Sequence, residues 1–287
     1  MAGGASGDRK LHTASRPGKI QAPRRPWIAP PISGYLVHSV FVPRRHPEPG
    51  PGKPMYLLVF DFDSTLVSVE GLDELFARSL ESSGGADAAR RLAEFRQVTD
   101  LGMAGAISAE ESLHRRLGAL RVDRETIDGV AARIRERLTP SVERHLPFFR
   151  QNASRIHVVS GGFEELIRPS LGRLGLPATQ LHAHRFVFDQ TDRVIGLDPQ
   201  TRIARGGKVG VVRSLGRHGA PVWMVGDGVN DLEVRLEGIA ERFIAFTENR
   251  RREPVVAGAD HVAESMDDVI RILESRPTSR KEEVEPR

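Results

Sequence analysis

Five short and nearly continuous apolar runs, separated by stretches of helical period, constrain the fold of this chain most strongly. The runs lie at residues 55–60, 155–160, 221–226, 242–246 and 259–263. A strand that is covered by helices on both faces has no polar face, so continuous apolar runs are typical of parallel sheets. Helical stretches at 163–175, 208–219, 231–240 and 266–275 separate most of them, which predicts an α/β domain with a doubly wound parallel sheet.

Residues 71–138 follow a different pattern. Four stretches there, 72–80, 88–102, 110–120 and 126–138, have a helical period, and no strand pattern interrupts them. Ser108 followed by Glu111 has the spacing of a capping box at the start of the third helix. We therefore expect an inserted α-helical cap between the first two strands of the core.

Residues 182–198 alternate between apolar and polar positions around central turn residues, which predicts a β-hairpin. His182 and His184 are expected to decorate this hairpin. Trp223 and Met224 lie within a core run, where packing explains both of them.

The basic character of the chain is concentrated near its start. Residues 1–53 hold nine Lys or Arg and two Asp or Glu, which leaves 42 − 9 = 33 basic and 38 − 2 = 36 acidic residues beyond them. Prolines break this leader repeatedly, so residues 1–54 are predicted to be a disordered basic segment rich in Pro, Gly and Arg. We favour a dispensable tail over an arm for nucleic acid or an organelle transit peptide.

The predicted domains are this leader, a catalytic core of residues 55–70 and 139–275, the cap at 71–138 and a charged tail at 276–287. The chain has no cysteine, which excludes disulfides and thiolate metal sites and suits the cytoplasm. No apolar run has the length that a bilayer requires, so we expect no membrane partner. The oligomeric state stays open.

Two carboxylates, Asp61 and Asp63, stand directly after the first apolar run. Ligands of open α/β sheets bind beyond the carboxyl ends of the strands. Two acidic groups so close repel each other unless a proton or a cation lies between them, and a hard ion such as Mg²⁺ suits this role.

Similar polar residues follow later runs. Ser160 and two glycines come at the expected start of a helix, Asp227 and Asp231 flank a Gly-rich turn, and Lys208 begins another helix. Carboxylates, a lysine, a hydroxyl and free amides in one crevice fit metal-assisted phosphoryl transfer.

The segments "DFDST", "SGG", "GGK" and "GDGVND" resemble the four signature motifs of the haloacid dehalogenase superfamily, most closely its phosphoserine phosphatase branch. The resemblance extends from about residue 55 to 274 and includes the cap stretch "VTDLGMAGAISAEESLHRRL". It implies a Rossmann-like core with a helical cap.

The resemblance also implies the catalytic roles. Asp61 would attack phosphorus and become an aspartyl phosphate, and Asp63 would act as acid and then as base. Mg²⁺ would be held by Asp61, the backbone carbonyl of Asp63 and Asp227, with support from Asp231.

The remaining contacts follow from the same resemblance. Ser160, the amide of Gly161 and Lys208 would hold the phosphoryl oxygens, and Asn230 would lie near the phosphate or the outer shell of the metal. Lys208 would also offset the charge of Asp61.

In the cap, the resemblance implies that Glu70 binds a substrate ammonium, Arg116 clamps a carboxylate and Met103 forms an apolar wall. The sequence departs from the family at Ala109, where a bulky apolar residue is usual, and residues 246–260 are unusually rich in arginine.

These features predict a Mg²⁺-dependent phosphomonoesterase that hydrolyses L-phosphoserine to serine and phosphate, the last step of serine biosynthesis. The alternative is a related phosphatase or phosphotransferase for another small phosphate ester, such as phosphothreonine or phosphohomoserine. Two further hypotheses remain. The first is a dehalogenase that uses the same nucleophile without a metal, and the second is a non-catalytic binding protein.

Overall fold

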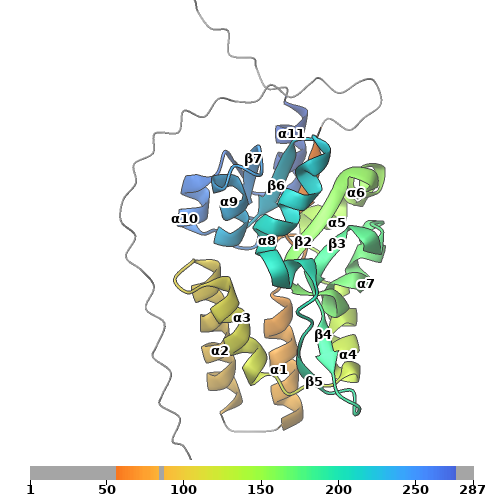
Figure 1. Cartoon of the computed structure of the whole chain (residues 1–287), viewed down its shortest axis with the longest axis vertical. Coiled ribbons are helices and arrows are strands. Elements are labelled where there is room, and N and C mark those ends of the chain that lie inside the picture. Colours follow the sequence, from red (N-terminus) through yellow and green to blue (C-terminus); the bar gives the residue numbers. More distant parts are fainter. Residues whose placement is uncertain (1–55, 84–86, 276–287) are drawn as a thin grey trace, which may run out of the picture. The chain divides into compact units, whose positions relative to one another are not determined.

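Six parallel strands form the central sheet in the order β3-β2-β1-β6-β7-β8 (Figure 1). The structure is a computed structural model and describes residues 56–83 and 87–275. The strands are β1 (Leu57–Phe60), β2 (Ile156–Phe163), β3 (Leu181–His184), β6 (Val222–Gly226), β7 (Arg242–Phe246) and β8 (His261–Ala263). The prediction of a doubly wound parallel sheet is therefore confirmed.

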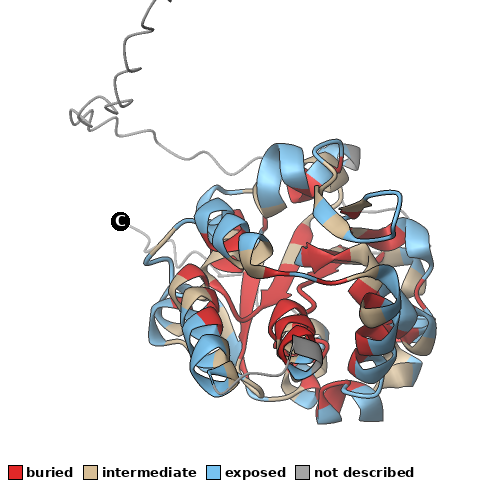
Figure 2. Cartoon of the chain, turned by 90° about the horizontal axis from the view of Figure 1, so that it is seen from below, coloured by how far each residue is buried: buried red, intermediate tan, exposed pale blue. Residues whose placement is uncertain are grey.

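Successive residues of each central strand face opposite layers of helices. In β1, Leu58 and Phe60 belong to one apolar cluster and Val59 to the other. The first cluster includes residues of α5 (Pro140–Arg144), α6 (Leu146–Gln151), α7 (Glu164–Leu174) and α11 (Met266–Glu274). The second includes residues of α8 (Arg202–Leu215), α9 (Val229–Leu236) and α10 (Glu253–Gly258). Because both faces are covered, the strands show no polar face, and Figure 2 shows them buried between helices.

In the described part of the chain, six α-helices lie between β1 and β2, and the first four of them fall within residues 71–138, where the period predicts four helices. These four are α1 (Gly71–Ser83), α2 (Ala88–Met103), α3 (Ala109–Ala119) and α4 (Arg124–Arg135), and we call them the insert. The side chain of Ser108 accepts a hydrogen bond from the amide of Glu111, so Ser108 is the N-cap of α3, which is the first half of the predicted capping box. Helices α1 and α2 pack together through the stacked rings of Phe76 and Phe95, and α4 packs along α7. The exact domain limits stay a prediction.

The hairpin prediction for residues 182–198 is right only for its second part. Strands β4 (Phe186–Phe188) and β5 (Val194–Leu197) form a two-stranded antiparallel ribbon. Residues Leu181–His184, in contrast, pair with β2 as an edge strand of the central sheet. Alternating polarity identifies a strand but not its partner, so His182 and His184 were assigned to the wrong sheet.

Several short elements carry too few residues for a periodic signal. They are α5, α6, α10 and the 3₁₀ turns Ala153–Arg155, Ala178–Gln180 and Gly216–His218. The predicted leader at 1–54 and tail at 276–287 lie outside the described residues. Within the described residues, no helix combines the length and the apolar character that crossing a membrane requires.

Candidate active site

The site lies where the strand order changes direction, beside β1 and β6. Asp61 directly follows β1, and its amide donates to the carbonyl of Val225 in β6 over 2.9 Å. Asp227 directly follows β6. Gly226 is required there, because a Cβ at this position would collide with the carboxylate of Asp231. Asp61 and Asp227 follow two neighbouring strand ends and Asp231 lies in the first turn of α9 (Val229–Leu236), so three acidic side chains converge at the topological switch point.

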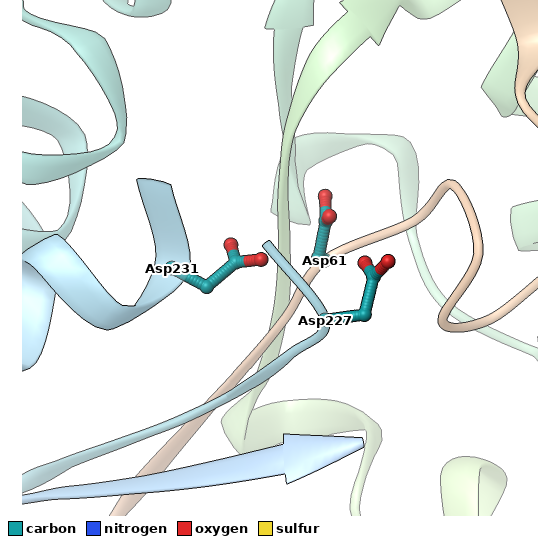
Figure 3. Close-up of side chains that lie close together, drawn as sticks. All are labelled: Asp61, Asp227 and Asp231. Atoms are coloured by element: carbon teal, nitrogen blue, oxygen red, sulfur yellow. The ribbon is translucent and has the colours of Figure 1, made fainter. Parts of the chain in front are cut away.

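Asp61, Asp227 and Asp231 form a buried acidic cluster (Figure 3). Each side chain offers one oxygen, and these oxygens lie within 4.8 Å of one another. Their exposed fractions are 2%, 2% and 0%. Buried carboxylates at this spacing repel each other, and an all-oxygen donor set of this kind suits a hard divalent cation.

Lys208 supplies a positive charge to the acidic cluster. Its Nζ lies 2.7 Å from Oδ1 of Asp61 and 2.6 Å from Oδ1 of Asp231. The left-handed backbone of Gly207, with φ of 59°, interrupts α8 immediately before it, a conformation that a residue with a Cβ adopts only under strain. Burial disfavours the charged ammonium, but the carboxylates of Asp231 and Asp61 outweigh it and raise the pKa of Lys208.

The same burial acts on the carboxylates of the cluster. Burial, with Asp61 next to it, raises the pKa of Asp231 to about 7. Burial also raises the pKa of Asp227 well above its usual value. Burial thus disfavours the ionised form of both carboxyl groups, and a proton or a cation beside them would offset this effect.

Asp227 has two further partners that the motifs do not indicate. Arg252 forms an ion pair with Oδ2 of Asp227, and the hydroxyl of Thr65 donates to Oδ1 over 3.3 Å. Arg252 is one of three consecutive arginines, and nothing in the sequence distinguishes it from its neighbours. It is the main site residue that sequence reasoning missed.

Asp63 lies beside the cluster. Its Oδ1 accepts a hydrogen bond of 2.8 Å from the amide of Gly71. Burial, followed by the charges of Glu70 and Asp61, raises the pKa of Asp63 well above its usual value. A raised pKa favours the protonated form of a carboxyl group, and this is the form that a general acid needs.

Ser160 and Gly161 were expected at the start of a helix, and this expectation is wrong. Strand β2 continues through Phe163, and α7 begins only at Glu164. The hydroxyl oxygen of Ser160 accepts the amide of Gly162 over 2.9 Å, which fixes its position. The sequence did not reveal that the strand continues here, because glycines have no side chains and leave no periodic signal at its end.

A cavity of about 430 Å³ opens over these residues. Its lining includes nine of the predicted site residues: Asp61, Asp63, Glu70, Met103, Arg116, Ser160, Gly161, Lys208 and Asn230. The other two, Asp227 and Asp231, are buried and do not belong to the lining. The volume lies in the range of about 300–1,000 Å³ that is usual for sites of small ligands.

Two oppositely charged residues of the lining have neutral partners. Glu70 accepts from the hydroxyl of Ser64 over 2.7 Å. Arg116 donates from Nε to the carbonyl of Ser112 over 3.3 Å and from Nη1 to Thr99 Oγ1 over 3.4 Å. Among the described residues neither of the two belongs to an ion pair, so both charges are available to a ligand that carries an ammonium and a carboxylate.

A buried carboxylate supports Arg116 from behind. Thr99 donates to Asp73 over 2.7 Å. Burial raises the pKa of Asp73, and the hydrogen bond from Thr99 and the charge of Arg116 lower it by a smaller amount. The sequence analysis did not identify Asp73 or Thr99, since a polar pair on two helices has no sequence signature.

Met103 and Ala109 bring the insert to the cavity. A Cβ built on Gly228 would lie 2.9 Å from Cε of Met103, so this methionine covers the turn that carries Asp227 and Asp231. Ala109 is the first residue of α3 and belongs to the cavity lining.

His184 is also part of the lining, which corrects its assignment to the hairpin. It is 7% exposed, and neither ring nitrogen has a hydrogen-bond partner among the described residues. Burial lowers the pKa of His184 to about 4, so the ring is neutral at physiological pH.

Comparisons with known proteins agree with this geometry. The family model of haloacid dehalogenase-like hydrolases matches residues 58–234. The chain is 32% identical over 218 residues to the chloroplastic phosphoserine phosphatase of Arabidopsis thaliana, covering 75% of this chain and 70% of the relative. It is 30% identical to the phosphoserine phosphatase of Homo sapiens, covering 68% and 83%. A phosphoserine phosphohydrolase-like protein from Francisella tularensis superposes with a TM-score of 0.69 at 26% identity, covering 76% of this chain and 100% of that one.

Proposed function

Because the chain belongs to the haloacid dehalogenase-like hydrolase family, we propose that it is a Mg²⁺-dependent phosphatase that converts L-phosphoserine to serine and phosphate. One observation carries the proposal: the buried acidic cluster with Lys208 faces a cavity in which Glu70 and Arg116 have no ionic partner. The relatives that are named phosphoserine phosphatase support the same substrate.

The residues of the cluster fit Mg²⁺. The proposed ligands are the carboxylates of Asp61 and Asp227 and the backbone carbonyl of Asp63, with Asp231 in support. When bound, the ion would neutralise the negative charge that the phosphoryl group adds to a site already rich in carboxylates. The raised pKa values of Asp227 and Asp231 support this proposal, because a nearby cation stabilises the ionised form of a buried carboxyl group.

In the proposed reaction, a carboxylate oxygen of Asp61 attacks phosphorus while the bond between phosphorus and the serine oxygen breaks. Asp63 gives its proton to the departing oxygen, and serine is released. Water then attacks the phosphorus of the aspartyl phosphate, Asp63 takes a proton from this water, and phosphate leaves from Asp61. The raised pKa of Asp63 supports the first proton transfer, because it favours the protonated form that donates.

The transferred group would be held by neighbours of Asp61. Ser160 Oγ, the amide of Gly161 and Nζ of Lys208 are the proposed donors to the phosphoryl oxygens, and Asn230 lines the cavity near them. Lys208 already contacts Asp61, so it can offset the repulsion between the nucleophile and an anionic substrate.

The rest of the substrate would lie against the insert. Glu70 would bind the ammonium group of the substrate, and Arg116 would bind its carboxylate. Met103 would contact its methylene group. Loss of the carboxylate or of the amine should therefore weaken binding more than loss of apolar contact would.

The decisive experiment is a substrate panel with and without Mg²⁺. Phosphoserine should exceed phosphothreonine, phosphohomoserine and a sugar phosphate by orders of magnitude in kcat/KM, and EDTA should abolish turnover until Mg²⁺ is added back. Activity on haloacids that EDTA does not affect would contradict the proposal and favour a dehalogenase. Deletion of residues 1–54 should leave the rates unchanged.

A second candidate is a related enzyme for another small phosphate ester. It is favoured by one observation, the presence of Ala109 in the cavity lining, because a small side chain there leaves room for a longer substrate. A flat profile across the panel would select this candidate.

The proposed location is the cytoplasm, in keeping with a chain without cysteine. The name of the Arabidopsis relative places that protein in the chloroplast.

A further inference from the structure

The arginine-rich segment after β7 directs only one of its three arginines inward. The side chain of Arg252 is 12% exposed, whereas Arg250 is exposed and the side chain of Arg251 is 48% exposed and pairs with Glu253. Burying a guanidinium is costly unless it is paired, so the position of Arg252 requires a partner that repays the loss of hydration.

Hydrogen bonds hold this segment on both sides of the arginines. The side-chain Nδ2 of Asn249 donates to the carbonyl of Ser64 over 3.1 Å and to Thr139 Oγ1 over 2.7 Å. Glu248 accepts from the amide of Ser141 over 3.1 Å. On the other side, the carbonyl of Arg252 accepts the first free amides of α10, those of Val255 and Val256, each over 3.0 Å. The structure therefore holds the base of the Arg252 side chain in place.

Arg252 makes two contacts with a single residue. Its Nη1 pairs with Oδ2 of Asp227 and also donates to the backbone carbonyl of Asp227 over 3.3 Å. A donor that bridges the main chain and the side chain of one residue restricts the rotation of that side chain. An ionised carboxylate has about four acceptor positions, so the guanidinium leaves sites free for a cation.

The surrounding charges explain why a cation is stable at this position. Besides Asp227, the guanidinium lies near Glu70, whose pKa its charge lowers against the larger, opposite effect of burial. Its charge thus acts on the carboxylate of the proposed metal site and on the carboxylate of the proposed ammonium site.

We propose that Arg252 is a positioning residue that orients the carboxylate of Asp227 for Mg²⁺. This inference rests on the proposed function, because it takes Asp227 as a metal ligand. Partners that orient metal ligands typically change metal affinity by about 10–100-fold when they are removed. The opposite sign is expected if Arg252 only competes with the metal, because removing a nearby positive charge would strengthen the binding of a cation.

The test is a calorimetric titration of the full chain with Mg²⁺ after chelation and dialysis. Arg252→Gln should weaken Mg²⁺ binding by about 10-fold or more. Arg252→Lys, which keeps one cationic donor, should fall between the wild type and Arg252→Gln, and it also serves if the glutamine variant does not fold. Arg251→Gln is the matched control from the exposed side of the segment and should bind Mg²⁺ within about twofold of the wild type.

Steady-state rates separate positioning from a general loss of structure. In Arg252→Gln the Mg²⁺ concentration for half-maximal rate should rise in step with the calorimetric Kd, while kcat at saturating Mg²⁺ stays within a few-fold. A fall in kcat and in the Tm without metal, with an unchanged Kd, would overturn the inference, as would tighter binding. A wild type that binds no Mg²⁺ would overturn both this inference and the metal dependence of the proposed function.

Discussion

The two sides of the cavity hold their charges in different ways. On the core side, Asp61, Asp231 and Asp227 are paired with Lys208 or Arg252. On the side that the insert completes, Glu70 and Arg116 are held by hydroxyl and carbonyl groups, as described above. We call these two sides the core crevice and the recognition wall.

This difference separates two tasks. Ion pairs fix the carboxylates of the core crevice before any ligand arrives, as preorganised catalysis requires. Neutral partners orient the residues of the recognition wall without cancelling their charge, so a zwitterionic substrate can bind through ion pairs of its own. Changes to the proposed catalytic groups of the core crevice should therefore affect kcat, and changes in the recognition wall should affect KM.

The largest effect is expected from Asp61→Asn in the core crevice. Removing the proposed nucleophile should lower kcat by roughly 10⁴-fold or more for every phosphate ester. Circular dichroism and the Tm should show an intact fold. An exposed aspartate, in Asp192→Asn, provides the control that keeps wild-type kcat. In the wild-type protein, BeF₃⁻ with Mg²⁺ should attach to Asp61. Attachment at another side chain would contradict the assignment of Asp61 as the nucleophile.

Arg116→Ala is the corresponding change in the recognition wall. Loss of a charge-assisted contact should raise KM for phosphoserine by roughly 10- to 100-fold. KM for an aryl phosphate, which has no carboxylate, should change much less. Arg115 is exposed and pairs with Glu111, so Arg115→Ala should leave both values near wild type. Equal effects of Arg116→Ala on the two substrates would remove Arg116 from the wall.

A pH profile tests Glu70 in the same wall. Burial raises the pKa of Glu70 from 4.5 to about 6, so the carboxylate is ionised above this pH and neutral below it. A neutral Glu70 does not attract an ammonium, so KM for phosphoserine should rise as the pH falls through about 6.

The phosphate of the substrate also titrates at a pKa of about 6, so a control is required. A phosphate ester with the same carboxylate and no amine should lack the additional rise in KM. Glu70→Gln should remove it for phosphoserine as well. If the glutamine variant keeps the same profile, Glu70 does not bind the amine.

The smallest effect is expected from Ala109→Phe at the edge of the wall. A larger side chain should fill part of the cavity and leave kcat/KM for phosphoserine within about threefold, because specificity from apolar volume alone is modest. Rates on longer phosphate esters should fall more. If they do not, Ala109 does not set the length of the substrate.

The core crevice was largely predictable from the sequence, because two of its carboxylates directly follow strong apolar runs. Asp61 follows the apolar run of β1, and Asp227 follows the apolar run of β6. Parallel strands bring their carboxyl ends to the same edge of the sheet. The recognition wall was predictable only through the family resemblance, since Glu70 and Arg116 are ordinary charged residues in their own segments. The roles assigned to these residues stay predictions, although the structure brings them to one cavity.

His184 and the glycines after Ser160 show where periodicity fails. Strand pairing depends on which partner lies alongside, so residues 181–184 joined the central sheet instead of the expected hairpin. The β2 strand also runs on to Phe163. The sequence did not predict this, because the glycines leave no periodic signal at the end of the strand.

By itself, the sequence determined the parallel sheet, the helical insert and the set of acidic strand ends, because local hydrophobic period and strand polarity encode all three. Only the tertiary structure decided which of three adjacent arginines reaches Asp227, which hydroxyls hold Glu70 and Arg116, and that His184 faces the cavity. These choices depend on distances between segments far apart in the chain, and a pattern along one segment carries no record of them.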